Sequence, residues 1–405
     1  MSTITPSPPV APRAPVSTPT GGVAVVAPAQ RVTTAAERRA FISPLDPAWS
    51  YSHGPWARLP HPGWPTDRMV AVMSDAWIRG EKVAKGGVGR RCSIVTDSPS
   101  ATMLAAGDGR TLSVSLDGAP AVRIGPLPTD GSRSEVPLFD NRRGPTRIEL
   151  IFDAAGANDG LYVAAVTADP LRLECENGVV VDRAFNVSTG ASCWTVSRAP
   201  DTDQPRRRLV VLGNGYAEGV GASVPGVVGC ASLIGERLKV EAVNQGWDGT
   251  DVDVRSGGAG DPRNSGIDRL ATDVIALQPT AVLLIYGLRA AASLRASWEY
   301  AHQYAVMLRT LRTALPSAPI FCSGFPPCNG DLSAAFVQEW NAAVRSAANT
   351  VDNCPFIEAG GWWGPENYYG GSGPVYVTGD KIHPNDAGHR FLADKYAAVI
   401  TQHLG

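Results

Sequence analysis

Asp380 and His383, three positions apart, are the first residues in this chain whose types and spacing could do chemistry. They lie in the segment Thr-Gly-Asp-Lys-Ile-His-Pro at 378–384, directly before a stretch with helical spacing. A histidine removes a proton from a nucleophile efficiently when a carboxylate orients its ring. The pair therefore predicts an acid–base dyad whose nucleophile must come from elsewhere in the chain.

Three other segments place small or polar residues directly after apolar runs. They read Leu-Val-Val-Leu-Gly-Asn-Gly-Tyr-Ala-Glu-Gly-Val-Gly at 209–221, Asn-Gln-Gly-Trp-Asp-Gly-Thr at 244–250 and Val-Leu-Leu-Ile-Tyr-Gly-Leu-Arg at 282–289. In open parallel sheets, reactive groups lie on the loops that follow the carboxyl ends of strands. We therefore expect these segments and the Asp–His pair to meet at one edge of a sheet.

Together the four segments, which cover about residues 208–402, resemble the sequence blocks of the SGNH (GDSL-type) hydrolases. The resemblance implies that His383 is the general base, that Asp380 orients its ring and that Gly249 is the oxyanion-hole glycine. At three functional positions of the family, this chain carries a different residue. The family's Asp-Ser pair is Asn214-Gly215 here, and the Asn that donates to the oxyanion is Arg289.

The missing hydroxyl at Gly215 dominates the functional prediction, since loss of a triad serine costs about a million-fold in turnover. Ser223 lies eight positions further along the chain, too far to stand at the strand end. We therefore expect a non-catalytic protein with a structural or glycan-binding role. The alternative is a weakly active carbohydrate esterase or deacetylase that uses Asp380 and His383 without the serine.

Arg289 has three open interpretations. As a charged and bulky side chain at an oxyanion position, it is expected to point into the former pocket and to pair with a carboxylate, most readily Asp380. It could instead bind an anionic group, or it is a solvated loop arginine. Because the four segments follow the carboxyl ends of strands at one edge of the sheet, we also expect the ring of His383 to lie near Gly215.

The C-terminal part, residues 208–405, alternates strand and helix patterns and predicts a three-layer α/β/α, flavodoxin-like domain with a parallel sheet. Strands are expected at 209–212, 239–243, 281–286 and 320–323. Helices are expected at 231–238, 266–276, 297–315, 332–348 and 386–402.

The N-terminal part divides into three segments and a linker. Residues 1–45 read as a Pro-rich extended arm, and residues 46–66 as an aromatic strap or, alternatively, a glycan-stacking surface. Residues 67–197 show short alternating strands typical of a jelly-roll-type β-sandwich, followed by a linker at 198–207. A β-sandwich before an SGNH-type domain is similar to the layout of carbohydrate esterase family 2.

Composition limits the partners. A formal charge of −2 gives no signal for nucleic acid, and no apolar run approaches the length of a membrane span.

The N-terminus lacks a signal-peptide pattern, so we expect synthesis in the cytoplasm. The arm and the catalytically incomplete domain suggest a phage virion component on a virion or extracellular surface. Its partners would be assembly proteins bound through the arm, and possibly a cell-surface glycan.

No metal site or cofactor is expected. Seven cysteines without a C-x-x-C motif favour buried thiols, and the best candidates for a bridge are Cys328–Cys354 or Cys175–Cys193.

Overall fold

The computed structural model describes sixteen stretches of the chain, all within one compact unit, Arg38–Gly405. They are residues 41–42, 49–54, 56–59, 68–71, 88–96, 101–106, 111–126, 134–140, 142, 144–152, 162–167, 196–197, 207–253, 265–286, 296–326 and 334–404. The predicted arm lies outside them except for residues 41–42, and the predicted linker except for Arg207. No helix among these stretches is both long and apolar enough to cross a membrane.

A parallel five-stranded sheet forms the centre of the C-terminal domain. Its strands are β13 (Arg208–Gly213), β14 (Glu241–Gly246), β15 (Ala281–Ile285), β16 (Ile320–Ser323) and β17 (Phe356–Ile357). They are arranged in the order β14-β13-β15-β16-β17, with every neighbouring pair parallel. In chain order this is 2-1-3-4-5, the order of flavodoxin-like sheets. The predicted fold of this domain is confirmed.

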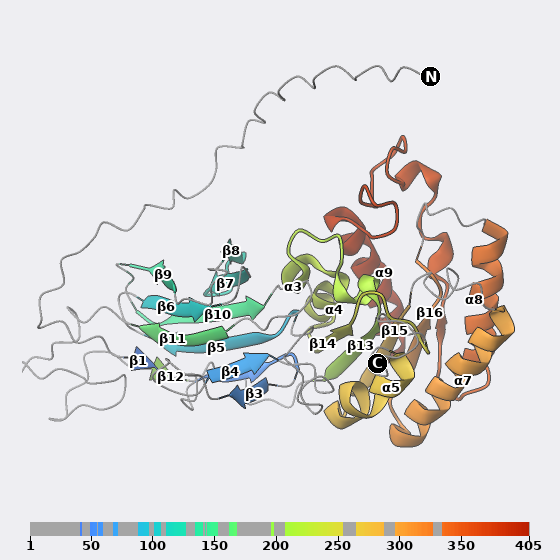
Figure 1. Cartoon of the computed structure of the whole chain (residues 1–405), viewed down its shortest axis with the longest axis horizontal. Helices are drawn as coiled ribbons and strands as arrows, with labels where there is room; N and C mark the ends of the chain where they lie inside the picture. The colour runs from blue at the N-terminus through green and yellow to red at the C-terminus, as the bar shows by residue number, and fades with distance from the viewer. Residues whose placement is uncertain are drawn as a thin grey trace, which may run out of the picture. The chain divides into compact units, whose positions relative to one another are not determined.

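Helices cover both faces of this sheet (Figure 1). The longer ones are α4 (Cys230–Leu238), α7 (Ser297–Ala314), α8 (Ala334–Ala348) and α9 (Asp386–Leu404). Alternate residues of β13 point to opposite faces, as the period of a strand requires. Val210 packs in the cluster that holds α7 and α8, and Val211 packs in the cluster that holds α4 and α9. The domain therefore has three layers.

Two predicted elements differ from the structure. The strand expected from residue 239 begins at Glu241, because Lys239 ends α4 in the left-handed conformation with φ 53°. The single helix expected over 266–276 is divided into α5 (Gly266–Arg269), a π-helical turn at Leu270–Val274 and a 3-10 turn at Ile275–Leu277.

The described residues of the N-terminal part form two antiparallel sheets, in agreement with the predicted β class. One sheet contains β2 (Ser50–Ser52), β5 (Arg91–Thr96), β7 (Leu112–Leu116), β8 (Val122–Ile124), β10 (Thr146–Phe152) and β12 (Val196–Ser197). The other contains β1 (Phe41–Ile42), β3 (Trp56–Leu59), β4 (Arg68–Ala71), β6 (Ala101–Ala106), β9 (Ser134–Phe139) and β11 (Tyr162–Thr167).

The two sheets share one apolar core and thus form a sandwich. Ile94 and Leu150 of the first sheet pack in one cluster with Met103 of the second. Trp49, from the segment interpreted as a strap, is buried in the same cluster. β2 and β3 from that segment pair with β5 and β4, so it contributes strands to both sheets. The finer jelly-roll assignment stays a prediction.

Arg90 joins the sandwich to the α/β domain. Its fully buried guanidinium donates to the backbone oxygen of His53 and, at 3.3 Å each, to the backbone oxygen of Asn244 and Oε1 of Gln245. Burial lowers its pKa to about 10, although the charges of Asp273 and Glu241 oppose that shift. Glu241 also accepts the backbone N–H of His53 at 2.8 Å.

The described cysteines, Cys92, Cys230, Cys322 and Cys354, are free buried thiols. The suggested Cys328–Cys354 bridge is therefore wrong. Cys354 lies just before β17, and the thiol of Cys322 on the neighbouring strand β16 donates to the backbone oxygen of Ile320. Cys175 and Cys193 lie outside the described residues.

Candidate functional site

Asp380 and His383 form a close pair on the loop before α9. Nδ1 of His383 lies 2.8 Å from Oδ2 of Asp380. Oδ1 of Asp380 accepts the hydroxyl of Thr378 at 2.6 Å and the backbone N–H groups of Ile382 and His383 at 2.8 and 2.9 Å. Partial burial alone would raise the pKa of Asp380, but these hydrogen bonds hold it well below its usual range. The carboxylate thus fixes both the loop and the ring.

Gly215 opens the short helix α2 (Gly215–Glu218), directly after β13. The side chain of Asn214 caps this helix by accepting the N–H of Tyr216. A β-carbon added to Gly215 would lie 2.6 Å from Nε2 of His383 and 2.6 Å from Oδ1 of Asp248. The structure therefore brings His383 to Gly215, as expected, but so closely that a side chain there would force its neighbours to shift.

Asp248 is the site residue that the sequence reasoning missed. Its Oδ1 lies 3.7 Å from Nε2 of His383, on the side of the ring opposite Asp380. Its backbone N–H donates to Oε2 of the buried Glu218 at 2.5 Å, which fixes the loop after β14. One feature of the sequence could have identified Asp248 as a site residue: it directly precedes Gly249, the expected oxyanion glycine.

His383 consequently lies between two carboxylates. Burial by itself would lower the pKa of His383, but the interactions with Asp248 and Asp380 outweigh it, so that the pKa is raised. The phenol of Tyr216 donates to the backbone oxygen of Ile382 at 2.7 Å, and its ring centroid lies 6.1 Å from that of His383. Tyr216 therefore ties α2 to the loop that carries the histidine.

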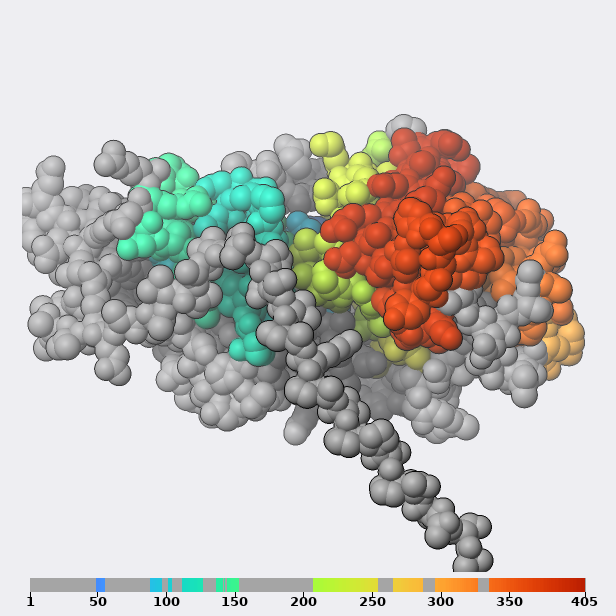
Figure 2. Space-filling model, turned by 90° about the horizontal axis from the view of Figure 1, so that it is seen from above, coloured from blue at the N-terminus to red at the C-terminus, as the bar shows by residue number. Residues whose placement is uncertain are grey.

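The segment that follows α2 packs against the loop that carries His383. Gly221 has φ +90°, and a β-carbon there would lie 2.2 Å from the backbone oxygen of Pro384, so only glycine fits. The backbone N–H and hydroxyl of Ser223 donate to Asp386 at 2.6 and 2.7 Å. Figure 2 shows the red C-terminal residues beside the yellow-green residues that follow β13. Ser223 thus binds the side chain of the first residue of α9, and Asn385 caps that helix by accepting the N–H of Gly388.

Of the two expected oxyanion positions, Gly249 and Arg289, the structure describes only Gly249. Gly249 adopts φ +78° directly after Asp248, which is the left-handed turn that favours glycine. Arg289, and with it the expected contact between Arg289 and Asp380, lies outside the described residues.

Residues 211–391 match the model of the GDSL-like Lipase/Acylhydrolase family. This match lies entirely within the α/β domain. In structure, the chain is similar to a salicylyl-acyltransferase from a tetracycline biosynthetic pathway, with a TM-score of 0.63 and 17% identity over 90% of this chain and 96% of that one.

It is also similar to two family two carbohydrate esterases. The one from Cellvibrio japonicus gives a TM-score of 0.59 and 16% identity, covering 90% of this chain and 98% of that one. The one from Clostridium thermocellum, solved in complex with cellohexaose, gives 0.59 and 15%, covering 84% and 95%. These likenesses show a shared two-domain fold. A comparison with curated proteins returned no match.

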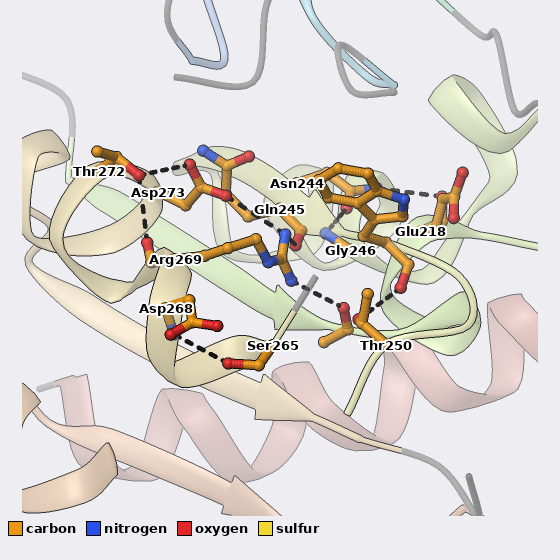
Figure 3. Close-up of polar contacts among 12 residues, drawn as sticks. Glu218, Asn244, Gln245, Gly246, Thr250, Ser265, Asp268, Arg269, Thr272 and Asp273 are labelled. Atoms are coloured by element: carbon orange, nitrogen blue, oxygen red, sulfur yellow. Dashed lines mark hydrogen bonds and ion pairs between the residues drawn. The ribbon is translucent and has the colours of Figure 1, made fainter. Parts of the chain in front are cut away.

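Near the site in the α/β domain, the buried side chain of Arg269 binds the ends of β13 and β14. The guanidinium of Arg269 donates to Asp273 at 3.3 Å and to the backbone oxygen of Gln245 at 3.1 Å (Figure 3). It also donates to the backbone oxygen of Gly213 at 3.5 Å and lies 5.5 Å from the ring of Trp247. Arg269 therefore supports both Gly215 and Asp248 from underneath.

His389, on the first turn of α9, has a structural role in the α/β domain. Its Nε2 lies 3.0 Å from the backbone oxygen of Val220, and its Nδ1 accepts the N–H of Cys230. Complete burial lowers its pKa to about 4, so the ring is neutral near pH 7. Within the described stretches, no cluster of three or more His, Cys, Asp or Glu side chains is arranged to hold a metal ion.

Proposed function

We propose that the α/β domain is a GDSL-like domain that has lost ester hydrolysis and serves as a binding or structural module. One observation carries the proposal: the space that a nucleophile's β-carbon would need at position 215 is bounded by His383 and Asp248 at 2.6 Å. A serine therefore cannot be accommodated at this position without rearrangement of the acid–base pair.

The electrostatics of His383 favour its protonated form. A base must be unprotonated before it can remove a proton, and carboxylates on both sides of the ring stabilise the protonated form. The same ion pairs make a stable, polar site at the carboxyl edge of the sheet.

A glycan is the ligand class that we favour. The structurally similar esterase from Clostridium thermocellum was solved with cellohexaose, and another similar structure is described as a carbohydrate esterase active site with catalytic and non-catalytic binding functions. We further propose that the protein works within a larger assembly, such as a phage virion. The support for that part is the Pro-rich sequence of residues 1–45 combined with an incomplete catalytic site.

A second candidate is weak hydrolysis by a water molecule that His383 activates. The observation in its favour is the 2.8 Å contact between Asp380 and His383, which is the geometry of a working dyad.

An ester assay separates the two. Release of acetate from acetylated xylo-oligosaccharides and of nitrophenol from p-nitrophenyl acetate would be measured for the full chain and for His383→Ala. We expect equal, background rates for both proteins. Turnover that disappears in His383→Ala would overturn the non-catalytic proposal and establish the second candidate.

A further inference from the structure

A cleft of about 350 Å³ lies between the sandwich and the α/β domain. One side is formed by β5, β10 and the turn after β7, and the other by the C-terminal half of α4. Figure 1 shows α4 on the side of the α/β domain next to the sandwich. A volume of this size falls at the lower end of the range of small-molecule pockets. The described residues that line the cleft do not include Gly215, Asp248 or His383.

Lys239 places a positive charge in this cleft. It ends α4 with φ 53°, and its backbone N–H donates to the carbonyl oxygens of Gly235 and Glu236. The residue is exposed, and its ammonium group makes no ion pair or hydrogen bond with any residue that the structure describes. Glycine is the usual residue in this left-handed position at the end of a helix. The cleft therefore contains a fixed lysine whose charge has no partner within the described chain.

Arg91 adds a second positive charge from β5. Its Nη1 atom lies 3.3 Å from Oε2 of Glu149. Within the described stretches, that is the only partner of the guanidinium group, since the buried Nε atom has no hydrogen-bond partner and Nη2 contacts no acceptor. The side chain is 24% exposed. Arg91 therefore keeps donors that a ligand in the cleft can use.

The remaining charged groups leave the cleft positive. Arg147 also pairs with Glu149, at 3.4 Å, so that two guanidinium groups share this carboxylate. The side chain of Glu236 is 69% exposed, and solvent screens its charge. With histidine counted as neutral, Arg91, Arg147 and Lys239 face Glu149 and Glu236, so the described lining carries three positive and two negative charges, a net charge of +1.

The donors and the net charge select the ligand group. The hydroxyl of Ser232 on α4 lines the same cleft and makes no hydrogen bond with the described residues. Ammonium and guanidinium groups only donate hydrogen bonds, so the ligand must accept them. A carboxylate accepts from several donors, matches the planar fork of an arginine and carries the single negative charge that neutralises the lining. A cationic ligand would be repelled by Lys239 and Arg91.

We infer that the cleft between α4 and the sandwich binds the carboxylate of a small organic anion, with Lys239 and Arg91 as its partners. The inference goes beyond the proposed function, because this cleft and the site at Gly215 share no described residue. Lys239 belongs to the α/β domain and Arg91 to the sandwich, so the bound anion would contact both. A ligand that binds only the folded arrangement also stabilises it.

Isothermal titration calorimetry of the full chain tests this inference. The probes are phenylacetate, indole-3-acetate and hexanoate, each compared with its primary amide as a neutral isostere. At least one carboxylate should bind, and its amide should bind about tenfold more weakly, because hydrogen bonds to a charged group are stronger. Binding of the carboxylate should also weaken as the salt concentration rises.

Lys239→Gly separates the loss of charge from the loss of fold. Because glycine favours the left-handed conformation of residue 239, the thermal midpoint of this variant should be at least as high as that of the wild type. Its affinity for the carboxylate should nevertheless fall about tenfold. Arg91→Gln should also weaken binding, whereas Glu236→Gln should strengthen it about twofold by removing a negative charge.

Lys381→Gly is the matched control. Lys381 is also an exposed lysine with a positive φ, 64°, but it does not line the cleft, so this variant should bind the carboxylate like the wild type. Failure of all three carboxylates to bind overturns the inference. So does equal binding of a carboxylate and its amide, or wild-type affinity in Lys239→Gly.

Discussion

Oδ1 of Asp248 lies 3.7 Å from Nε2 of His383, and both atoms lie 2.6 Å from the point that a β-carbon on residue 215 would occupy. Gly215 and the second carboxylate beside His383 are therefore linked in space. A side chain at residue 215 would force the ends of the Asp248 and His383 side chains to shift.

Restoring the serine should therefore destabilise the domain without restoring activity. We expect Gly215→Ser to lower the free energy of unfolding by about 2 kcal/mol, the usual cost of forcing atoms into filled space. Urea denaturation measures this change, and ester turnover should stay at background.

A double-mutant cycle with Asp248→Gly provides the control. Because the two substitutions meet in one small space, their effects should not add, and the double variant should be more stable than the sum of the single variants predicts. Strict additivity would show that the side chains do not compete for that space.

The pKa of His383 should depend on Asp248. Its folded-state pKa is raised, so the folded protein binds the extra proton between about pH 6.5 and that raised value. The stabilisation is fully present below about pH 6.5 and is lost as the pH rises through the raised pKa. NMR titration of the ring should give a lower pKa in Asp248→Asn, where Asp380 alone remains. An unchanged pKa would mean that Asp248 does not interact with the ring.

His389 should govern stability in a different pH range. Its folded-state pKa is lowered from 6.5 to about 4, so the unfolded chain binds the extra proton between these values. The stabilisation is present above pH 6.5 and falls by up to about 3 kcal/mol as the pH drops to 4. Unfolding free energies across this range should show a smaller slope for His389→Gln. The matched control, His302→Gln, changes an exposed histidine on α7.

Arg90 should contribute more to stability than its neighbour Arg91. Arg90→Met removes a fully buried charge from three acceptors, and we expect a loss of about 3 kcal/mol in the free energy of unfolding. Arg91 is 24% exposed and pairs with Glu149, so Arg91→Met should cost about 1 kcal/mol or less. Equal losses in the two variants would contradict the role of Arg90 as the buried link.

The framework of the domain was predictable from sequence because it depends on local periodicity. The apolar run at 281–286 and the helical spacing at 297–315 gave β15 and α7 within one residue. The placement of His383 beside Gly215 followed from the rule that loops after parallel strands meet at one edge.

The parts that failed depend on contacts between distant segments. Asp248 reads as an ordinary turn residue, and only the fold brings it to a histidine more than one hundred positions away. Arg90 follows Gly-Gly-Val-Gly, which looks like an exposed turn, yet it is fully buried. The pairing of β2 with β5 was missed because three residues are too few for a strand pattern.

Gln245 is contacted from opposite parts of the chain. Arg90 of the sandwich reaches its side-chain oxygen and Arg269 of the α/β domain reaches its backbone oxygen. Gln245 is three positions before Asp248 on the same strand and loop. Any exchange of the N-terminal module for that of a relative would thus disturb the support of Asp248. The two modules must be inherited and engineered as one piece.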